Sequence, residues 1–274
     1  MKKRESKGKF LNPKNLLIGF VVIIIFLLIL NYFYPLLNII NQNDGAGELY
    51  QLFPVEPIPL GGSPEYNDKD ILKCSVKIII ECPNDGVSKI SGTIIDTRDG
   101  FGLISTVGHA FRDHIDTGNS GELKDGCKIK IDPQWDNNEN TIPGKLRHCN
   151  LNDDVGFVSI PLPPGAQKCP LASKDFEYKV GMKLIKAGCP EGHACTIRTV
   201  SITHINRYLG QPNIEISPAQ KEGESGGGVF DENGNLVCIM YASDYEDNEG
   251  LCTPLSGIMD NLKACGLDKI IGVK

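Results

Sequence analysis

Residues 222–235 read EGESGGGVFDENGN, and they place a single serine, Ser225, among glycines directly before an apolar run. A flexible linker would account for the glycines. It would not account for the strand-like sequence VFDENGNLVCIMY, which follows from Val229 and carries its own turn at Asn233-Gly234. Glycine permits positive φ angles and close approach of the backbone. The stretch therefore predicts a tightly bent loop that turns the Ser225 hydroxyl and nearby N–H groups toward a substrate.

The segments on both sides of this loop read as short strands separated by turns. Several alternate apolar and polar residues with a period of two, which is typical of half-buried strands. Asp99-Gly100 and Asn233-Gly234 suit tight hairpins, and a helical pattern is confined to PLSGIMDNLKACG, residues 254–266. The sequence predicts an all-β barrel or sandwich. Examples of the strand-like runs are CSVKIIIEC, SGTIID, FGLIST, CKIKID, VGFVSIPL, MKLIKAG, TVSITHI, PNIEIS, GGVF and NLVCIMYA.

The first forty residues differ from the rest of the chain. Residues 1–15 are basic, and residues 16–40 carry no charge. A helix needs about 20 apolar residues to cross a bilayer, and a basic flank stays in the cytoplasm. We expect a cytoplasmic tail at 1–15, a transmembrane signal anchor at 16–40 and an extracytoplasmic remainder. A cleaved signal peptide, which would release a secreted protein, is the alternative.

The rest of the chain divides into a short tether and one folded region. Residues 41–70 hold four prolines and four glycines and predict an exposed linker. Residues 71–274 are long enough for one domain or two small fused ones. The net charge of −6 provides no basic stripe for nucleic acid.

Ten cysteines, all beyond the apolar segment, favour disulfides in an oxidising compartment. No C-x-x-C pair occurs, and the spacings fit no common zinc pattern, so no metal or cofactor is predicted. Cys189 and Cys195 could close a short loop. The cysteines are Cys74, Cys82, Cys127, Cys149, Cys169, Cys189, Cys195, Cys238, Cys252 and Cys265.

Two further residues could act with Ser225 in catalysis. Acyl transfer needs a nucleophile, a base and donors for the oxyanion, and histidine is the usual base because its unperturbed pKa is near 6.5. His109 ends the apolar run in LISTVGHAF, whereas His114 looks solvated. Asp154, in LNDDVGFVSIPL, opens a strand, and its neighbour Asp153 is expected to face solvent. Taken singly, His109 fits an ordinary turn or core histidine, and Asp154 fits a turn or cap residue. Ser225 alone fits a glycine-rich hairpin loop.

Together, the order His109, Asp154, Ser225 on an all-β background resembles the chymotrypsin-like serine peptidases. STVGHAF is similar to that family's histidine motif, DDVGFVSI to its aspartate motif and GESGGGVFDENGNLVCI to its serine motif. GLCTPLSGIMDNL looks like its last strand and C-terminal helix. The resemblance spans about Ile71 to Leu267. It implies two antiparallel six-stranded β-barrels with a short C-terminal helix and a site between the barrels.

The resemblance also implies a reaction and its residues. Ser225 would attack the scissile carbonyl, His109 would take its proton, and Asp154 would orient the imidazole. The N–H groups of Gly223 and Ser225 would form the oxyanion hole. The implied function is a membrane-tethered serine endopeptidase acting on proteins or peptides without a cofactor. The alternatives are an inactive peptidase-like binding module and a cysteine-rich adhesive ectodomain.

The sequence departs from the family pattern at several positions. Glu224 replaces the aspartate before the serine, and no Ile-Val-Gly-Gly sequence begins the domain, so no activation by cleavage is expected. This resembles the bacterial and glutamyl-endopeptidase-like branches. Ala110 replaces a cysteine that many animal members carry, and Gly228 replaces a proline.

The predicted substrate pocket lacks the acid of trypsin-type members. Ala219 stands six residues before the serine, which argues against a preference for Lys or Arg. Tyr241 and Ser243 are expected at the pocket's edge and Gly250 in one wall. Lys221 either favours an acidic substrate side chain or faces solvent.

Overall fold

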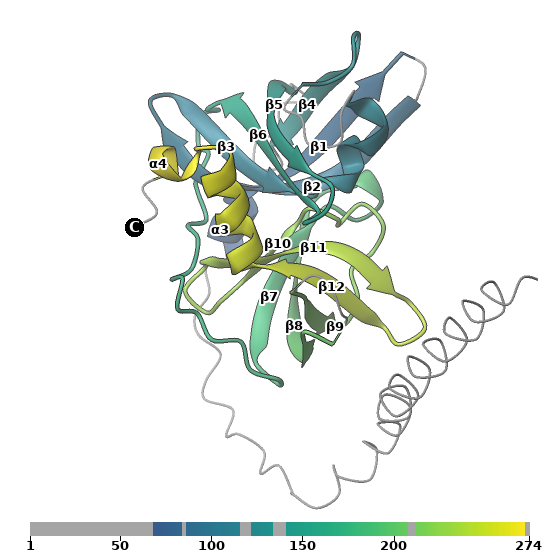
Figure 1. Ribbon diagram of the computed structural model, residues 1–274, viewed down its shortest axis with the longest axis vertical. Coiled ribbons are helices and arrows are strands. Elements are labelled where there is room, and N and C mark those ends of the chain that lie inside the picture. The colour runs from purple at the N-terminus through teal and green to yellow at the C-terminus, as the bar shows by residue number, and fades with distance from the viewer. Residues whose placement is uncertain (1–67, 84–85, 116–121, 134–140, 208–211, 272–274) are drawn as a thin grey trace, which may run out of the picture. The chain divides into compact units, whose positions relative to one another are not determined.

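The computed structural model describes residues 68–271, apart from 84–85, 116–121, 134–140 and 208–211 (Figure 1). The expected tail at 1–15, signal anchor at 16–40 and nearly all of the tether at 41–70 lie outside these residues. Within the described ranges, every helix is too short or too polar to span a membrane. Residues Ser63–Lys274 form one compact unit.

The first half of this unit is a closed antiparallel barrel with the strand order β1-β2-β3-β6-β5-β4. In β1, Val76, Ile78 and Ile80 are buried and alternate with half-buried neighbours, as the period of two predicted. Asp99 and Gly100 both have positive φ, as a tight primed hairpin turn requires. The strands are β1 (Ser75–Cys82), β2 (Gly86–Arg98), β3 (Phe101–Thr106), β4 (Lys128–Pro133), β5 (Ile142–Asn150) and β6 (Val155–Pro161).

The second half is another closed barrel, with the order β10-β11-β12-β9-β8-β7. Its β10–β11 hairpin is closed at the predicted place, where the Asp231 carboxylate accepts the N–H groups of Asn233 and Asn235 and Gly234 has φ 76°. The strands are β7 (Lys183–Gly188), β8 (Thr196–Ile205), β9 (Ile214–Ser217), β10 (Gly228–Phe230), β11 (Leu236–Asp244) and β12 (Glu249–Pro254). Two six-stranded barrels are therefore confirmed.

Short helices flank and join the barrels. The C-terminal helix α3 lies beside the two barrels (Figure 1). Its Ile258 and Leu262 pack into the core that holds the first barrel's side chains, and its Leu255 and Met259 pack into the second core. It thereby fixes one barrel against the other. The helical elements are α2 (Asp68–Cys74), η3 (His109–His114), η4 (Pro190–Gly192), α3 (Leu255–Ala264) and α4 (Asp268–Ile271). The sequence did not predict α2, which begins within the expected tether.

Three disulfides occur among the described residues: Cys74–Cys169, Cys82–Cys127 and the predicted short bridge Cys189–Cys195. The other cysteines, Cys149, Cys238, Cys252 and Cys265, are free thiols.

The disulfide that closes the longest loop should matter most for stability. Cys74 and Cys169 are 95 residues apart, and a cross-link restricts the unfolded chain more when the loop is longer. Replacing both by alanine is expected to lower the free energy of unfolding by about 2–4 kcal/mol, measured by urea denaturation. Cys265→Ala, which removes a free thiol, should cost about 1 kcal/mol or less. Equal midpoints for the two variants would contradict the expectation.

Candidate active site

The structure brings His109 and Asp154 into direct contact at the rim of the first barrel. Asp154 Oδ1 accepts the His109 backbone N–H at 2.6 Å, and Oδ2 lies 2.8 Å from His109 Nδ1. Gly108 allows this approach because a Cβ there would lie 2.5 Å from Asn150 O. Asp154 adopts φ 53°, a left-handed angle that aspartate tolerates better than most residues. The carboxylate therefore fixes both the backbone and the ring of His109, and leaves Nε2 facing away from it.

The neighbouring acid Asp153 belongs to a different network. Its carboxylate accepts N–H groups from Asn150 at 2.7 Å and from Asn261 of α3 at 2.9 Å. The expectation that Asp153 faces solvent is only partly met, because its carboxylate bonds to α3 and the residue is half-buried. The expectation that Asp154 is the acid turned toward His109 agrees with the geometry.

The loop around Ser225 is bent as the glycines predicted. Gly223 and Gly226 have φ of 83° and 87°. Ser91 of β2 holds the loop from the first barrel: its N–H donates to Ser225 O at 2.8 Å, and its hydroxyl donates to Gly223 O at 2.7 Å. Among the described residues, the N–H groups of Gly223 and Ser225 donate to no protein acceptor. Two such donors on one tight turn can bind an oxyanion.

His109 and Ser225 line one cleft of about 590 Å³. The first barrel supplies His109 and part of β2, and the second barrel supplies the Ser225 loop together with Ser243 and Tyr245. No direct hydrogen bond joins Ser225 to His109 in the described structure. Catalytic contacts are often longer in a substrate-free site and shorten when substrate binds.

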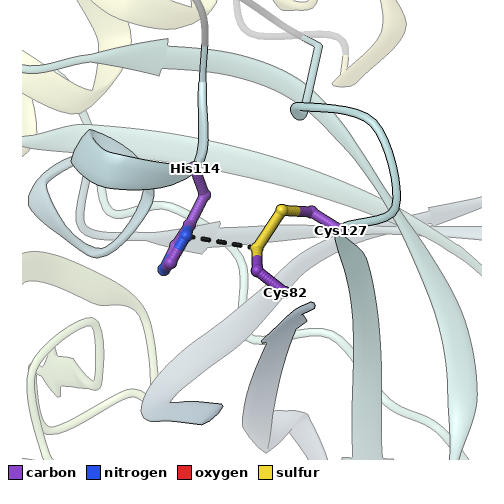
Figure 2. A group of neighbouring side chains, drawn as sticks. All are labelled: Cys82, His114 and Cys127. Atoms are coloured by element: carbon purple, nitrogen blue, oxygen red, sulfur yellow. Dashed lines mark hydrogen bonds between the residues drawn. A yellow bond between two sulfur atoms is a disulfide. The ribbon is translucent and has the colours of Figure 1, made fainter. Parts of the chain in front are cut away.

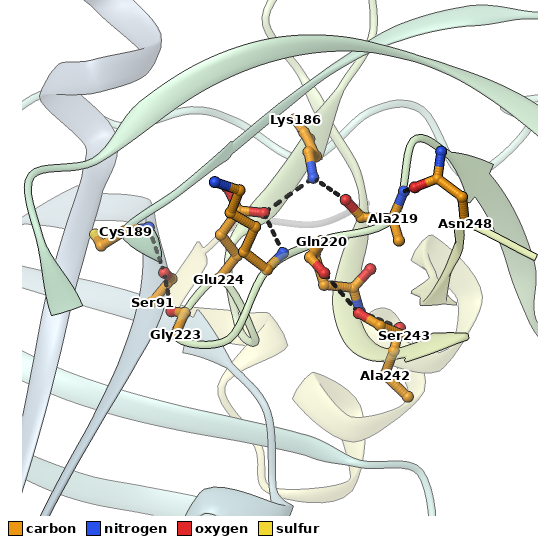
Figure 3. A network of polar contacts seen from close by, with 11 residues as sticks. Ser91, Lys186, Cys189, Ala219, Gln220, Gly223, Glu224, Ala242, Ser243 and Asn248 are labelled. Atoms are coloured by element: carbon orange, nitrogen blue, oxygen red, sulfur yellow. Dashed lines mark hydrogen bonds and ion pairs between the residues drawn. The ribbon is translucent and has the colours of Figure 1, made fainter. Parts of the chain in front are cut away.

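Only one of the four predicted pocket residues lines the cleft. Ser243 lines it, whereas Ala219, Tyr241 and Gly250 do not. Gln220 occupies the space between the expected walls. Its side chain is buried, and its Nε2 donates to Ala242 O (Figure 3). Its Oε1 lies against Gly250. The sequence contains no signal for this arrangement, because it depends on how β11, β12 and the loop pack.

Two groups of side chains have spacings that a metal could use. In the first, Cys82 and Cys127 are joined as a disulfide, with His114 Nδ1 at 3.2 Å from Cys82 Sγ (Figure 2). Bonded sulfurs are not thiolate ligands, so this group does not form a zinc site. His114 is buried, which corrects the expectation that it is solvated.

The second group consists of His204, Glu215 and Glu249 on β8, β9 and β12. His204 Nδ1 lies 3.2 Å from Glu215 and 3.4 Å from Glu249. The Arg207 guanidinium bridges the same two carboxylates at 3.2 and 3.1 Å. Because Arg207 pairs with both carboxylates, these side chains form an ion-pair network.

A thiol near the His109–Asp154 pair is not a rival nucleophile. Burial, and to a lesser extent the charge of Asp154, raise the pKa of Cys149 to about 12. Cys149 Sγ also lies 3.4 Å from Gly108 O, to which it donates. The thiolate is the reactive form of cysteine, so Cys149 stays unreactive at neutral pH.

Comparison with known proteins places this geometry in a known fold. No protein-family model and no curated protein matches the sequence. The Mycobacterium tuberculosis protease Rv3671c, in its active form, matches with a TM-score of 0.57 and 17% identity, over 78% of this chain and 94% of that chain. An inactive serine-to-alanine form of the same protein matches with a TM-score of 0.57 and 15% identity, over 78% of this chain and 98% of that chain.

A serine endoprotease from Yersinia pestis matches with a TM-score of 0.57 and 17% identity, over 73% of this chain and 65% of that chain. At these identities the likeness establishes the fold. It confirms the two-barrel architecture that the resemblance to the chymotrypsin-like peptidases implied.

Proposed function

We propose that this protein is a serine endopeptidase that hydrolyses peptide bonds through an acyl-enzyme. The observation that carries the proposal is the cleft between two barrels, with an Asp154-held imidazole on one side and the Ser225 hydroxyl on the other. The similarity in fold to proteins described as proteases supports it.

The proposed reaction uses groups of this chain alone. Ser225 Oγ attacks the peptide carbonyl while His109 Nε2 accepts its proton, and the carbonyl oxygen becomes an anion bound by the N–H groups of Gly223 and Ser225. Asp154 holds Nδ1–H and stabilises the imidazolium. His109 then protonates the leaving amine. Water, deprotonated by the same imidazole, cleaves the ester and regenerates Ser225.

A fluorophosphonate probe tests the proposal directly. The probe should label the folded protein, and peptide mass spectrometry should locate the adduct on Ser225. Casein should be cut at internal bonds, which separates an endopeptidase from an esterase. A folded protein with intact disulfides that takes up no probe would support the inactive binding module or the adhesive ectodomain instead.

Gly223→Ala is expected to slow labelling by about 10²–10³-fold, the usual cost of losing one oxyanion donor. The alanine must keep φ near 83°, and its Cβ would lie 2.8 Å from both Cys189 O and Glu191 N, so the loop must move. Second-order labelling rates measure the effect.

Gly181→Ala is the matched control for this change. Gly181 has φ 84°, but a Cβ there would meet open space. It carries the same backbone strain without the collision, and its labelling rate should stay near that of the wild type. Equal losses in the two variants would contradict an oxyanion role for Gly223.

We also propose that residues 16–40 anchor the enzyme in a membrane, with the peptidase domain outside the cytoplasm. The uncharged stretch and its basic flank support this. The full-length chain should remain in the membrane pellet after alkaline carbonate extraction. A soluble product with a new N-terminus beyond residue 40 would favour the secreted alternative.

A further inference from the structure

Three strands of the second barrel bring one histidine and two glutamates together on one face of the sheet. His204 of β8 pairs directly with Glu215 of β9, and Leu251 of β12 pairs with Glu215 from the other side. Glu249 stands two residues before Leu251, so its side chain leaves the sheet on the same face. The register of β8 shifts by one residue at Thr203, and this shift places His204 opposite Glu215. Possible ligand atoms of the histidine and the two glutamates all lie within 4.8 Å of one another.

Glu215 is fully buried, although it points away from the barrel core. Its neighbours Ile214 and Ile216 fill that core, so the carboxylate lies on the opposite face of β9. The residue is 0% exposed, and its Oε1 accepts no hydrogen bond from the described residues. A buried carboxylate oxygen without a partner is costly. This atom therefore indicates a position that a cation would stabilise.

The ring of His204 has an unpartnered nitrogen at the same place. Its Nδ1 is buried and lies 3.2 Å from Glu215 Oε2 and 3.4 Å from Glu249 Oε1. Nδ1 has no hydrogen-bond partner among the described residues, so neither of these contacts is aligned as a hydrogen bond. The distances suit a shared metal ion, because two ligand atoms on one tetrahedral zinc ion lie about 3.4 Å apart.

The guanidinium of Arg207 leaves this position open. It lies 3.2 Å from Glu215 Oε2 and 3.1 Å from Glu249 Oε2, so the Oε1 atom of each carboxylate remains for another cation. Burial, and next the contact with Glu249, raises the pKa of Glu215. A raised pKa is expected where two carboxylates meet with too little positive charge between them.

We propose that His204, Glu215 and Glu249 bind a divalent metal ion of the zinc class. An imidazole ligand favours zinc over calcium and magnesium, and three protein ligands leave a fourth position for water. Arg207 stays on the outer oxygens of the two carboxylates. The sequence did not predict this site, because its three ligands lie on separate strands and form no short motif. The inference does not depend on the proposed peptidase function.

A metal ion at this site would fasten the β11–β12 hairpin to β8 and β9. Glu249 is the first residue of β12, and its neighbour Asn248 accepts the N–H of Ala219, in the loop that leads to Ser225 (Figure 3). Ser243, on the other strand of the hairpin, lines the cleft. We therefore expect the ion to stabilise this wall of the cleft.

Zinc binding to the full-length wild type is the first test. The protein is freed of metal with EDTA and is then titrated with zinc chloride in a calorimeter at neutral pH. One ion per chain should bind at micromolar concentration or below, and saturation should raise the thermal unfolding midpoint. A folded wild type that binds no zinc at these concentrations overturns the proposal.

Variants then locate the bound ion. His204→Gln removes one ligand at a side chain that is 42% exposed, so the fold should be kept. Its zinc affinity should fall at least about 100-fold, because the loss of an outer partner alone costs 10–100-fold. Glu249→Gln, on a different strand, should have a similar effect. His193→Gln is the matched control, because His193 also lies beside a glutamate, 3.8 Å from Glu191, but outside the proposed site.

The control variant should bind zinc as tightly as the wild type. Zinc binding that persists unchanged in folded His204→Gln and Glu249→Gln overturns the proposal. Binding that is lost in His109→Ala instead would place the ion in the catalytic cleft, and this result also overturns it.

Discussion

Replacing Ser225 by alanine is expected to reduce kcat/KM for peptide hydrolysis about 10⁶-fold, and His109→Ala should have a similar effect. In the proposed mechanism Ser225 supplies the bond-forming oxygen and His109, which lines the same cleft, is the base. The two act as one unit, so the double variant should be no slower than either single one. Steady-state assays on a peptide library, supported by single-turnover kinetics, would measure the three rates.

The control for this prediction is another serine of the same cleft. Ser243 lines the cleft, and its hydroxyl donates to Gln220 O at 2.7 Å. Ser243→Ala keeps the reacting groups and should change kcat/KM by less than about tenfold, the loss of one neutral hydrogen bond. If Ser225→Ala kept a tenth of wild-type activity, Ser225 would not be the nucleophile.

Much of the site could be predicted because its residues have strong local signals. Glycines on both sides of Ser225 specify a turn with positive φ, and the structure has that turn. His109 begins η3 shortly after β3 ends, Asp154 directly precedes β6, and β3 and β6 pair in the same sheet. Adjacent strands bring their ends together, so two residues 45 positions apart meet at 2.8 Å.

The strand that the sequence did not predict lacks such a signal. β5, Ile142–Asn150, contains Pro143 and Gly144, and only Leu146 and Cys149 along it are buried. Its place between β4 and β6 comes from closure of the barrel. Periodicity cannot detect a strand whose backbone, rather than its side chains, completes the sheet.

The burial of certain polar residues could not be predicted from the sequence for a different reason. Lys186 stands in MKLIKAG, where alternation alone does not reveal whether a lysine faces water or a carboxylate. Its partner Glu224 is 38 residues away. Gln220 is a similar case, since β11 covers it, and Asp153 is half-buried because its carboxylate bonds to α3. Their burial depends on the tertiary packing of the second barrel and α3.

Asp154→Asn is expected to lower kcat/KM about 10⁴-fold with little change in stability. Two contacts dictate how the new amide must lie. The His109 backbone N–H needs an acceptor at the position of Oδ1, 2.6 Å away, so the amide oxygen should take that place. The amide NH₂ then faces His109 Nδ1, where Oδ2 now lies at 2.8 Å. A donor there forces Nδ1 to accept, which moves the ring proton to Nε2.

An imidazole protonated at Nε2 cannot accept the proton of Ser225, so the variant should fold normally yet acylate slowly. Asp153→Asn is the matched control, because Asp153 adjoins Asp154 but bonds Asn150 and Asn261 instead. It should keep acylation within about tenfold of the wild type, consistent with the loss of structural hydrogen bonds alone. NMR of the ring nitrogens would show the proton on Nδ1 in the wild type and on Nε2 in Asp154→Asn. An unchanged tautomer together with a large rate loss would mean that Asp154 acts mainly through its charge on the imidazolium.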